Sequence, residues 1–179
     1  MIGNLAVGGK VGAVATPTAL VYARSSMPRI GVISDTHGLV RPEALRALAG
    51  ADLIVHAGDV GGPEVLDALR TVAPVVAVRG NNDRGAWAAA LAETEVVETD
   101  GRSLYVLHDL KELDLDPRAA GFDAVIAGHS HQPRIERRDG VLYLNPGSAG
   151  PRRFRLPIAV AWLAVQPARL DAEIVQLDV

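Results

Sequence analysis

Residues 31–38 read GVISDTHG, an apolar run that suits a buried strand and leads directly into Asp35 and His37. Strands covered on both faces are apolar along their whole length, as in parallel sheets flanked by helices. A carboxylate and an imidazole at the exit of such a strand therefore predict a polar site at the edge of a sheet. The strength of this prediction depends on whether the other strands end in the same way.

The part of the chain that follows alternates strands with helices. Apolar strands are expected at 29–34, 53–56 and 74–78, and helices at 42–49 and 63–71. Both helices have a proline in the first turn and place leucines on one face. This alternation predicts β-α-β units and a sheet that is covered on both faces.

The second half of the chain is dominated by hairpins. Two Asp-Gly dipeptides favour tight turns between 95–99 and 102–107, and between 134–138 and 141–144. A short buried strand is expected at 124–127, and a final antiparallel pair at 158–165 and 170–177. Two packed sheets with helices outside accommodate both halves.

The composition excludes several classes of protein. The chain has 179 residues, no cysteine, a net charge of −3 and 49% hydrophobic residues, which fits one globular domain. The lack of cysteine removes disulfides, thiolate metal sites and cysteine nucleophiles, and it suits a cytoplasmic protein. Because there is no basic tract and no apolar run of bilayer-spanning length, neither nucleic acid nor a membrane is expected as a partner.

Residues 1–26 differ in composition from the rest and are rich in Gly, Ala, Val and Ser. We expect a flexible, dispensable leader, followed by one domain over 27–179. Met27 stands directly before PRIGVISDTHG, so it could be the true start of the protein. A signal peptide is the alternative, but the segment lacks a clear charged region at its start.

The other strand ends repeat the pattern of the first. They carry HAGD (56–59), RGNND (79–83), LHD (107–109), AGHSH (127–131) and NPGS (145–148). All five histidines of the chain fall beside such ends, at His37, His56, His108, His129 and His131. Since consecutive loops at one edge of a layered α/β fold converge, these side chains are expected to share one pocket.

Clustered carboxylates repel one another, and divalent metal ions relieve that repulsion. The candidate metal-binding side chains at these strand ends are too many for one ion, but they suit two. Nitrogen and oxygen donors without sulfur favour Mn, Fe, Co, Ni or Zn over Mg or Ca. Two such ions, held by two carboxylates and a hydroxide, would leave the centre near +1, which suits the anion of a phosphate ester.

The motifs SDTHG, HAGD, RGNND, AGHSH and NPGS, in this order, resemble those of the calcineurin-like metallophosphoesterases. The likeness is closest to the small prokaryotic phosphodiesterases of that superfamily, and it covers Met27 to about the C-terminus. It implies a four-layer αββα sandwich of two mixed β-sheets flanked by helices. It also implies two divalent ions as cofactors, with Mn expected and Ni, Co, Fe or Zn as alternatives.

The resemblance assigns roles to particular residues. Asp35, His37 and His131 would hold one ion, and Asp59 would bridge both. The second ion would be held by Asn81, His108 and His129. The bridging water or hydroxide would attack phosphorus, and the residues expected to take part in catalysis are Asp59, Asn81, Asn82 and His108.

The sequence departs from the family pattern at two positions. Many members have a histidine, placed to protonate the leaving group, where this chain has Asn82. Because general-acid help is worth about 10²–10⁴-fold, this departure favours substrates with good leaving groups. Relatives also usually have glycine where this chain has Asp109, which would alter the charge beside His108.

Other polar residues admit plainer interpretations. His56 is expected to be a packed or supporting residue rather than a ligand, and Asp83 either orients a ligand or caps a helix. Asn145 and Ser148 are expected to form a structural turn. The segment PRRFR, residues 151–155, faces either the substrate phosphate or solvent, and the sequence does not decide between them.

The favoured function is a two-metal phosphodiesterase acting on small phosphate esters, with a phosphomonoesterase as its nearest alternative. A protein-binding scaffold is a third candidate, because a eukaryotic retromer subunit uses this fold as a platform. A nuclease is disfavoured by the small size and acidic balance of the chain. The surfaces rich in Ala and Leu would permit a homodimer.

Overall fold

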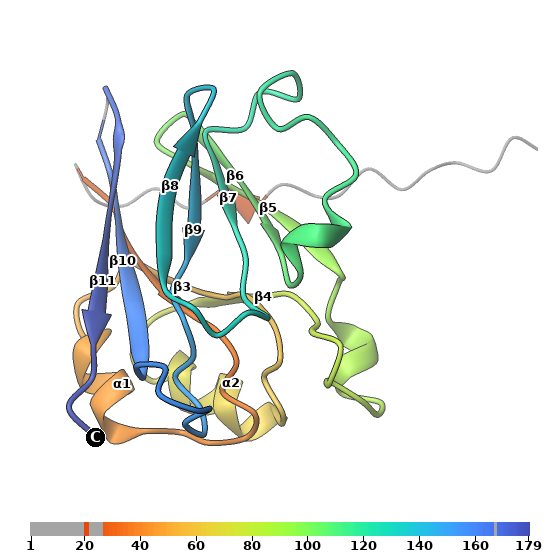
Figure 1. The fold of residues 1–179 in the computed structure, drawn as a ribbon, viewed down its shortest axis with the longest axis vertical. Coiled ribbons are helices and arrows are strands. Elements are labelled where there is room, and N and C mark those ends of the chain that lie inside the picture. Colours follow the sequence, from red (N-terminus) through yellow and green to blue (C-terminus); the bar gives the residue numbers. More distant parts are fainter. Residues whose placement is uncertain (1–19, 22–26, 167) are drawn as a thin grey trace, which may run out of the picture.

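The structure, a computed structural model, describes residues 20–21, 27–166 and 168–179. Two mixed β-sheets pack against each other (Figure 1). In the five-stranded sheet, ordered β11-β10-β2-β3-β4, the three strands at one side are parallel, and β10 runs antiparallel to β2 and β11. Its strands are β2 (Arg29–Ile33), β3 (Leu53–His56), β4 (Val75–Ala77), β10 (Ala159–Val165) and β11 (Leu170–Gln176).

The six-stranded sheet has the order β1-β5-β6-β7-β9-β8. Strands β6, β7 and β9 are parallel, while β5 and β8 pair antiparallel with β6 and β9. Its strands are β1 (Leu20–Val21), β5 (Thr94–Thr99), β6 (Arg102–Leu107), β7 (Ala124–Ile126), β8 (Arg134–Arg138) and β9 (Val141–Asn145). Each sheet thus contains a parallel set whose loops leave at one edge.

The main core lies between the two sheets. It forms because successive side chains of a strand point to opposite faces of its sheet, which places alternate apolar residues between the sheets. Along β2, Ile30 and Val32 enter this core, whereas Ile33 points to the opposite face of the sheet. From the other sheet, Leu104, Ile126 and Leu144 meet them, at 1% exposure or less. Fully burying one such side chain contributes about 1.5–3 kcal/mol.

Two α-helices cover the outer face of the five-stranded sheet. They are α1 (Pro42–Ala47) and α2 (Pro63–Arg70), each with proline at the start, as expected for a helix whose first N–H groups lack partners. Leu48, just after α1, and Leu69 of α2 pack on Ile33 and Ile54. The helices fix the loops that follow β2 and β3, which carry the first candidate ligands.

The outer face of the six-stranded sheet has a thinner cover. A 3₁₀ turn, η2 (Leu110–Glu112), and the loop after it lie there, with Leu110 and Leu113 packed beside Tyr105 and Tyr143. This segment contains Asp116, Pro117 and Gly121, which favour turns over a helix. The expected sandwich of two mixed sheets with flanking helices is confirmed, with both described α-helices on one side.

The expected elements match the observed ones closely. The strands expected at 53–56, 102–107 and 134–138 are found with those bounds, and the other expected elements shift by one or two residues at an end. Neither 3₁₀ turn was expected, η2 or the second one, η1 (Ala88–Ala90). Of the expected leader, Leu20 and Val21 pair parallel to β5. Its remaining residues, 1–19 and 22–26, lie outside the described part. None of the described helices is long and apolar enough to cross a membrane.

Candidate metal centre

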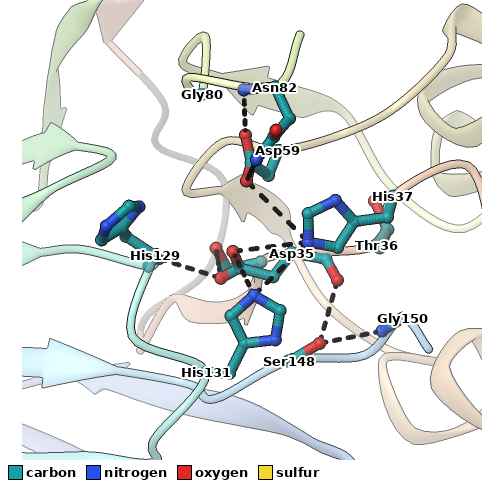
Figure 2. A network of polar contacts seen from close by, with 12 residues as sticks. Asp35, Thr36, His37, Asp59, Gly80, Asn82, His129, His131, Ser148 and Gly150 are labelled. Carbon is teal, nitrogen blue, oxygen red and sulfur yellow. Dashed lines mark hydrogen bonds and ion pairs between the residues drawn. The ribbon is translucent and has the colours of Figure 1, made fainter. Parts of the chain in front are cut away.

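The expected site residues gather at one edge of the sandwich because they follow parallel strands of both sheets. Strands β2, β3 and β4 lead to Asp35 with His37, to Asp59 and to Asn81, respectively. From the facing sheet, β6 leads to His108 and β7 leads to His129 and His131. Figure 2 shows Asp35 in the middle of this group, with His37 and His131 pointing toward it.

Asp35, His37 and His131 form one cluster, here termed the buried half. The Asp35 Oδ1 atom lies 3.1 Å from His131 Nε2 and 4.0 Å from His37 Nε2. The two imidazole Nε2 atoms are 3.4 Å apart. Asp35 is fully buried and His131 is 4% exposed, so these donors point into the protein rather than into bulk water.

Asn81, His108 and His129 form a second cluster, here termed the open half. The Asn81 Oδ1 atom lies 3.1 Å from both His108 Nε2 and His129 Nδ1. His108 is buried and donates its Nδ1 hydrogen to the Ala57 carbonyl at 2.7 Å, which turns Nε2 toward the site. By contrast, Asn81 is exposed and the His129 side chain is 38% exposed.

Asp59 lies between the two halves. Its Oδ2 atom is 3.8 Å from His37 Nε2 and 3.4 Å from His108 Nε2. Burial alone would raise the pKa of the Asp59 carboxyl, but contacts with His108 and Asn82 outweigh it and hold that pKa well below its usual range. Asp59 is therefore a carboxylate at neutral pH, with one oxygen directed at both halves.

The spacing of the donor atoms suits bound metal ions better than it suits direct hydrogen bonds between the donors. Two ligands that bind one ion at about 2.1 Å lie about 3–3.5 Å apart, close to most separations seen here. In addition, Asp35 Oδ1 is buried and accepts no hydrogen bond in the described structure. An unsatisfied buried carboxylate oxygen costs free energy, which a bound cation would recover. The nitrogen and oxygen donor set suits Mn, Fe, Co, Ni or Zn.

The backbone is strained at the candidate ligands. Among the described residues, eight that are not glycine have positive φ, and five of these are Asp35, His37, Asp59, His129 and His131. Their φ angles lie between 48° and 65°. Such conformations cost about 1–3 kcal/mol each and persist where the surrounding structure enforces them, typically at functional sites.

Hydrogen bonds from neighbouring loops fix Asp35 in place. Its Oδ2 accepts from Ser34 Oγ at 2.7 Å. Figure 2 shows two further bonds, from the His129 amide to Oδ2 at 3.0 Å and from Ser148 Oγ to the Asp35 carbonyl at 2.9 Å. Gly128 permits this approach, because a Cβ there would collide with Ser34 Oγ. The sequence did not single out Ser34, since a serine at a strand end carries no distinctive signal.

Asp83, Asn145 and His56 support the site without joining either cluster. Asp83 accepts from the amides of Gly61 and Gly80 at 2.8 Å, and so ties the Asp59 and Asn81 loops together. Asn145 Oδ1 accepts from the Gly147 amide at 2.9 Å, as expected for a turn. Fully buried His56 contacts Thr36 Oγ1 through Nε2 at 2.9 Å, and burial lowers the pKa of His56 to about 4.

The two departures from the family pattern both contact candidate ligands. Asn82 donates to Asp59 twice, from its backbone nitrogen to Oδ1 at 2.8 Å and from Nδ2 to Oδ2 at 2.7 Å. Asp109 Oδ2 lies 3.5 Å from His129 Nε2, on the far side of the ring from Asn81. Each departure therefore bears on how a ligand is oriented.

The segment 151–155 lies beside the buried half. Arg153 Nη2 is 3.4 Å from His37 Nε2, whereas Arg152 Nη2 donates to the Val179 carbonyl at 3.2 Å. Thus one arginine of this segment is turned toward the site and its neighbour is turned away.

Known proteins share both the sequence and the fold. Residues 28–167 match the calcineurin-like phosphoesterase superfamily domain. A probable metallophosphoesterase of Methanothermobacter thermautotrophicus is 36% identical over 159 residues, which cover 82% of this chain and 91% of that protein. A phosphodiesterase of Methanocaldococcus jannaschii is 28% identical over 138 residues, which cover 66% of this chain and 82% of that protein.

Among solved structures, Vps29 of Chaetomium thermophilum has the same fold. Its TM-score is 0.68 at 19% identity, over 84% of this chain and 100% of that one. Together with the match over residues 28–167, these similarities establish the family. The chain belongs to the calcineurin-like phosphoesterase superfamily.

Proposed function

We propose that this protein is a two-metal phosphodiesterase that hydrolyses small phosphate esters. The observation that carries the proposal is the position of Asp59, whose Oδ2 lies 3.8 Å from His37 Nε2 and 3.4 Å from His108 Nε2. A carboxylate oxygen between two donor clusters is where two divalent ions would share a ligand. The similarity to a phosphodiesterase of Methanocaldococcus jannaschii supports the class of reaction.

When bound, a pair of divalent ions lowers the pKa of a water molecule and offsets the charge of the phosphoryl group. The chain supplies the matching donors. Asp35 and Asp59 offer two anionic oxygens, and the other donors are imidazoles and an amide. The loaded centre would therefore stay positive toward an anionic ester. Because Asp35 and Asp59 are already held by hydrogen bonds, little rearrangement is needed when substrate arrives.

The contacts of Asn82 bear on the choice of substrate. Its amide donates a hydrogen bond to Asp59, and a carboxamide is too weak an acid to transfer a proton to a leaving alkoxide. Without a general acid at this position, turnover depends on leaving groups that depart unprotonated. Phenolic and other acidic alcohol esters are therefore the favoured substrates. Diesters are favoured over dianionic monoesters for a separate reason, because a centre near +1 matches the single negative charge of a diester.

The test is hydrolysis of bis-p-nitrophenyl phosphate and p-nitrophenyl phosphate by metal-stripped protein, with Mn, Ni, Co, Zn and Mg added back singly. Turnover should return with a transition metal and be faster on the diester. The Asn81→Ala variant, which removes a ligand at an exposed position, should fold normally and lose most of that turnover.

If no metal restored turnover, the proposal that the protein is a phosphodiesterase would be refuted. If two ions were nonetheless bound, the scaffold on the same fold would become the better account. Faster hydrolysis of the monoester would instead indicate a phosphomonoesterase.

A further inference from the structure

Phe154 is an unusual residue for the surface on which it lies. It is 94% exposed, the highest value among the large hydrophobic side chains that the structure describes as exposed. Its φ is 53°, in the left-handed region that bulky side chains rarely adopt. Packing therefore does not account for a phenylalanine here, and the backbone conformation would favour glycine.

The other residues with positive φ each have a clear reason for it. Besides the five candidate ligands, Asp100 and Asp139 precede Gly101 and Gly140 in the two hairpin turns, which require this conformation. Phe154 is the remaining member of this group of eight in the described structure. Strain of this kind persists mostly where function needs it, and Phe154 lies next to a functional site.

The surroundings of Phe154 adjoin the buried half of the metal centre. Together with Gln132, Arg155 and Leu156, it borders a shallow, open stretch of the surface. Gln132 directly follows the candidate ligand His131. On the other side, Arg153 Nη2 lies 3.4 Å from His37 Nε2. Arg153 thus places this segment beside a candidate ligand, and a substituent on a phosphorus atom held there would extend over the segment that carries Phe154.

We propose that Arg153 and Phe154 form a clamp for phosphodiesters that carry a flat aromatic substituent. Arg153 pairs with a phosphoryl oxygen, and Phe154 stacks on the aromatic ring. This inference rests on the proposed function and narrows its substrate class. The charges agree with it, because Arg153 and Arg155 place two cations beside an anionic ester, while aromatic rings stack on an exposed phenyl face.

The test compares the binding of two diesters, diphenyl phosphate and diethyl phosphate, to the metal-loaded protein by a rapid titration that is complete before phenol is released. Both are monoanions, and diphenyl phosphate has flat rings whereas diethyl phosphate has none. The Phe154→Gly variant should bind diphenyl phosphate about tenfold more weakly and diethyl phosphate as the wild type does, because one stacking contact is lost. Phe154→Trp should retain the affinity for diphenyl phosphate.

Stability provides a second readout. Since glycine adopts φ near 53° without strain, Phe154→Gly should unfold at the same temperature as the wild type or higher. A loss of affinity without a loss of stability is not expected for a residue whose role is structural.

The arginines supply a matched pair of variants. Arg153→Ala should weaken both diesters by a similar factor, because its contact is with the phosphoryl group that they share. Arg152→Ala should change neither, since Arg152 donates to the Val179 carbonyl instead.

Unchanged affinity of Phe154→Gly for diphenyl phosphate would overturn the clamp. Turnover of bis-p-nitrophenyl phosphate by the same variant would then show that the proposed function still holds. If no metal supported turnover, the proposed function would fail, and the two binding constants would still decide the clamp. A wild-type dimer that becomes a monomer in Phe154→Gly, with unchanged ester binding, would assign Phe154 to an interface and overturn the proposal.

Discussion

The two halves of the candidate metal centre differ in how far they are withdrawn from water. The buried half contains Asp35, at 0% exposure, and His131, at 4%. The open half contains the exposed Asn81 and His129, whose side chain is 38% exposed. A carboxylate in surroundings of low dielectric gains more from a cation than one in water does. We therefore expect the buried half to bind its ion more tightly.

The halves also differ in how firmly their ligands are held. In the buried half, Asp35 receives two hydrogen bonds on Oδ2, and the His37 amide donates to the Asp59 carbonyl at 2.9 Å. In the open half, His108 is held by the Ala57 carbonyl at 2.7 Å, but the outer nitrogen of the half-exposed His129 meets Asp109 only at 3.5 Å, so His129 is the least firmly held ligand. The comparison predicts sequential loading, with the open half filled second and emptied first.

Replacing Asp35 should have the largest effect. Asp35→Asn keeps the shape of the side chain but removes the charge from the fully buried oxygen that accepts no hydrogen bond. We expect turnover to fall by at least about 10²–10³-fold, with loss of the tightly bound ion. Metal analysis and turnover, with circular dichroism to verify the fold, check this. If Asp35→Asn retained both ions and its turnover rate, this would refute the claim that the buried half holds the more tightly bound ion.

Acid should destabilise the folded protein through the buried His56, whose Nε2 contacts Thr36 Oγ1. The pKa of His56 is lowered by burial to about 4, below its ordinary value of 6.5. Between these pH values the unfolded chain binds the proton and the folded chain does not, so stability is full above pH 6.5 and falls toward pH 4. The loss attributable to His56 is up to about 3 kcal/mol.

Denaturant unfolding of the wild type and of His56→Gln at several pH values between 7 and 4.5 checks this. Glutamine can keep a polar contact with Thr36 but does not titrate. The stability of the variant should therefore depend less steeply on pH. Parallel curves for the two proteins would mean that His56 does not contribute to acid sensitivity.

Asp109 should have the smallest effect, confined to the open half. Asp109→Asn can still accept from the Lys111 amide, as Asp109 Oδ1 does at 3.0 Å, but it loses the charge beside His129. Loss of a residue that orients a metal-binding histidine lowers metal affinity by about 10–100-fold. Because the contact between Asp109 and His129 is long, we expect the affinity for the second ion to fall by about tenfold. Stepwise metal titration checks this. Weakening of the first ion instead would reverse the assignment of the halves.

Much of the fold could be predicted from local sequence. Strands β3 and β6 have the expected bounds, because apolar runs and Asp-Gly turns are short-range signals. The convergence of Asp35, Asp59 and His129 could also be predicted, since each follows a strand of a parallel set. The thin layer over the six-stranded sheet could not be predicted. The resemblance implied helices on both sides of the sandwich, whereas residues 109–123 form turns.

Several features of the site depend on contacts between distant residues. Asp109 meets His129 only because β6 and β7 pair in parallel register, and Arg153 approaches His37 across 116 positions of sequence. The positive φ values of Asp35 and His131 are likewise imposed by the tertiary structure. The single-sequence patterns used for strands and helices do not report such contacts or backbone angles.

The most direct test of the account is an electron paramagnetic resonance titration of the metal-stripped protein with Mn²⁺. Because Asp59 Oδ2 is directed at both halves, the second equivalent should produce the spectrum of two exchange-coupled ions about 3.5–4 Å apart. The first equivalent alone should give an isolated ion in the buried half. Saturation at one ion per chain, or two ions that remain magnetically independent, would contradict a centre shared through Asp59.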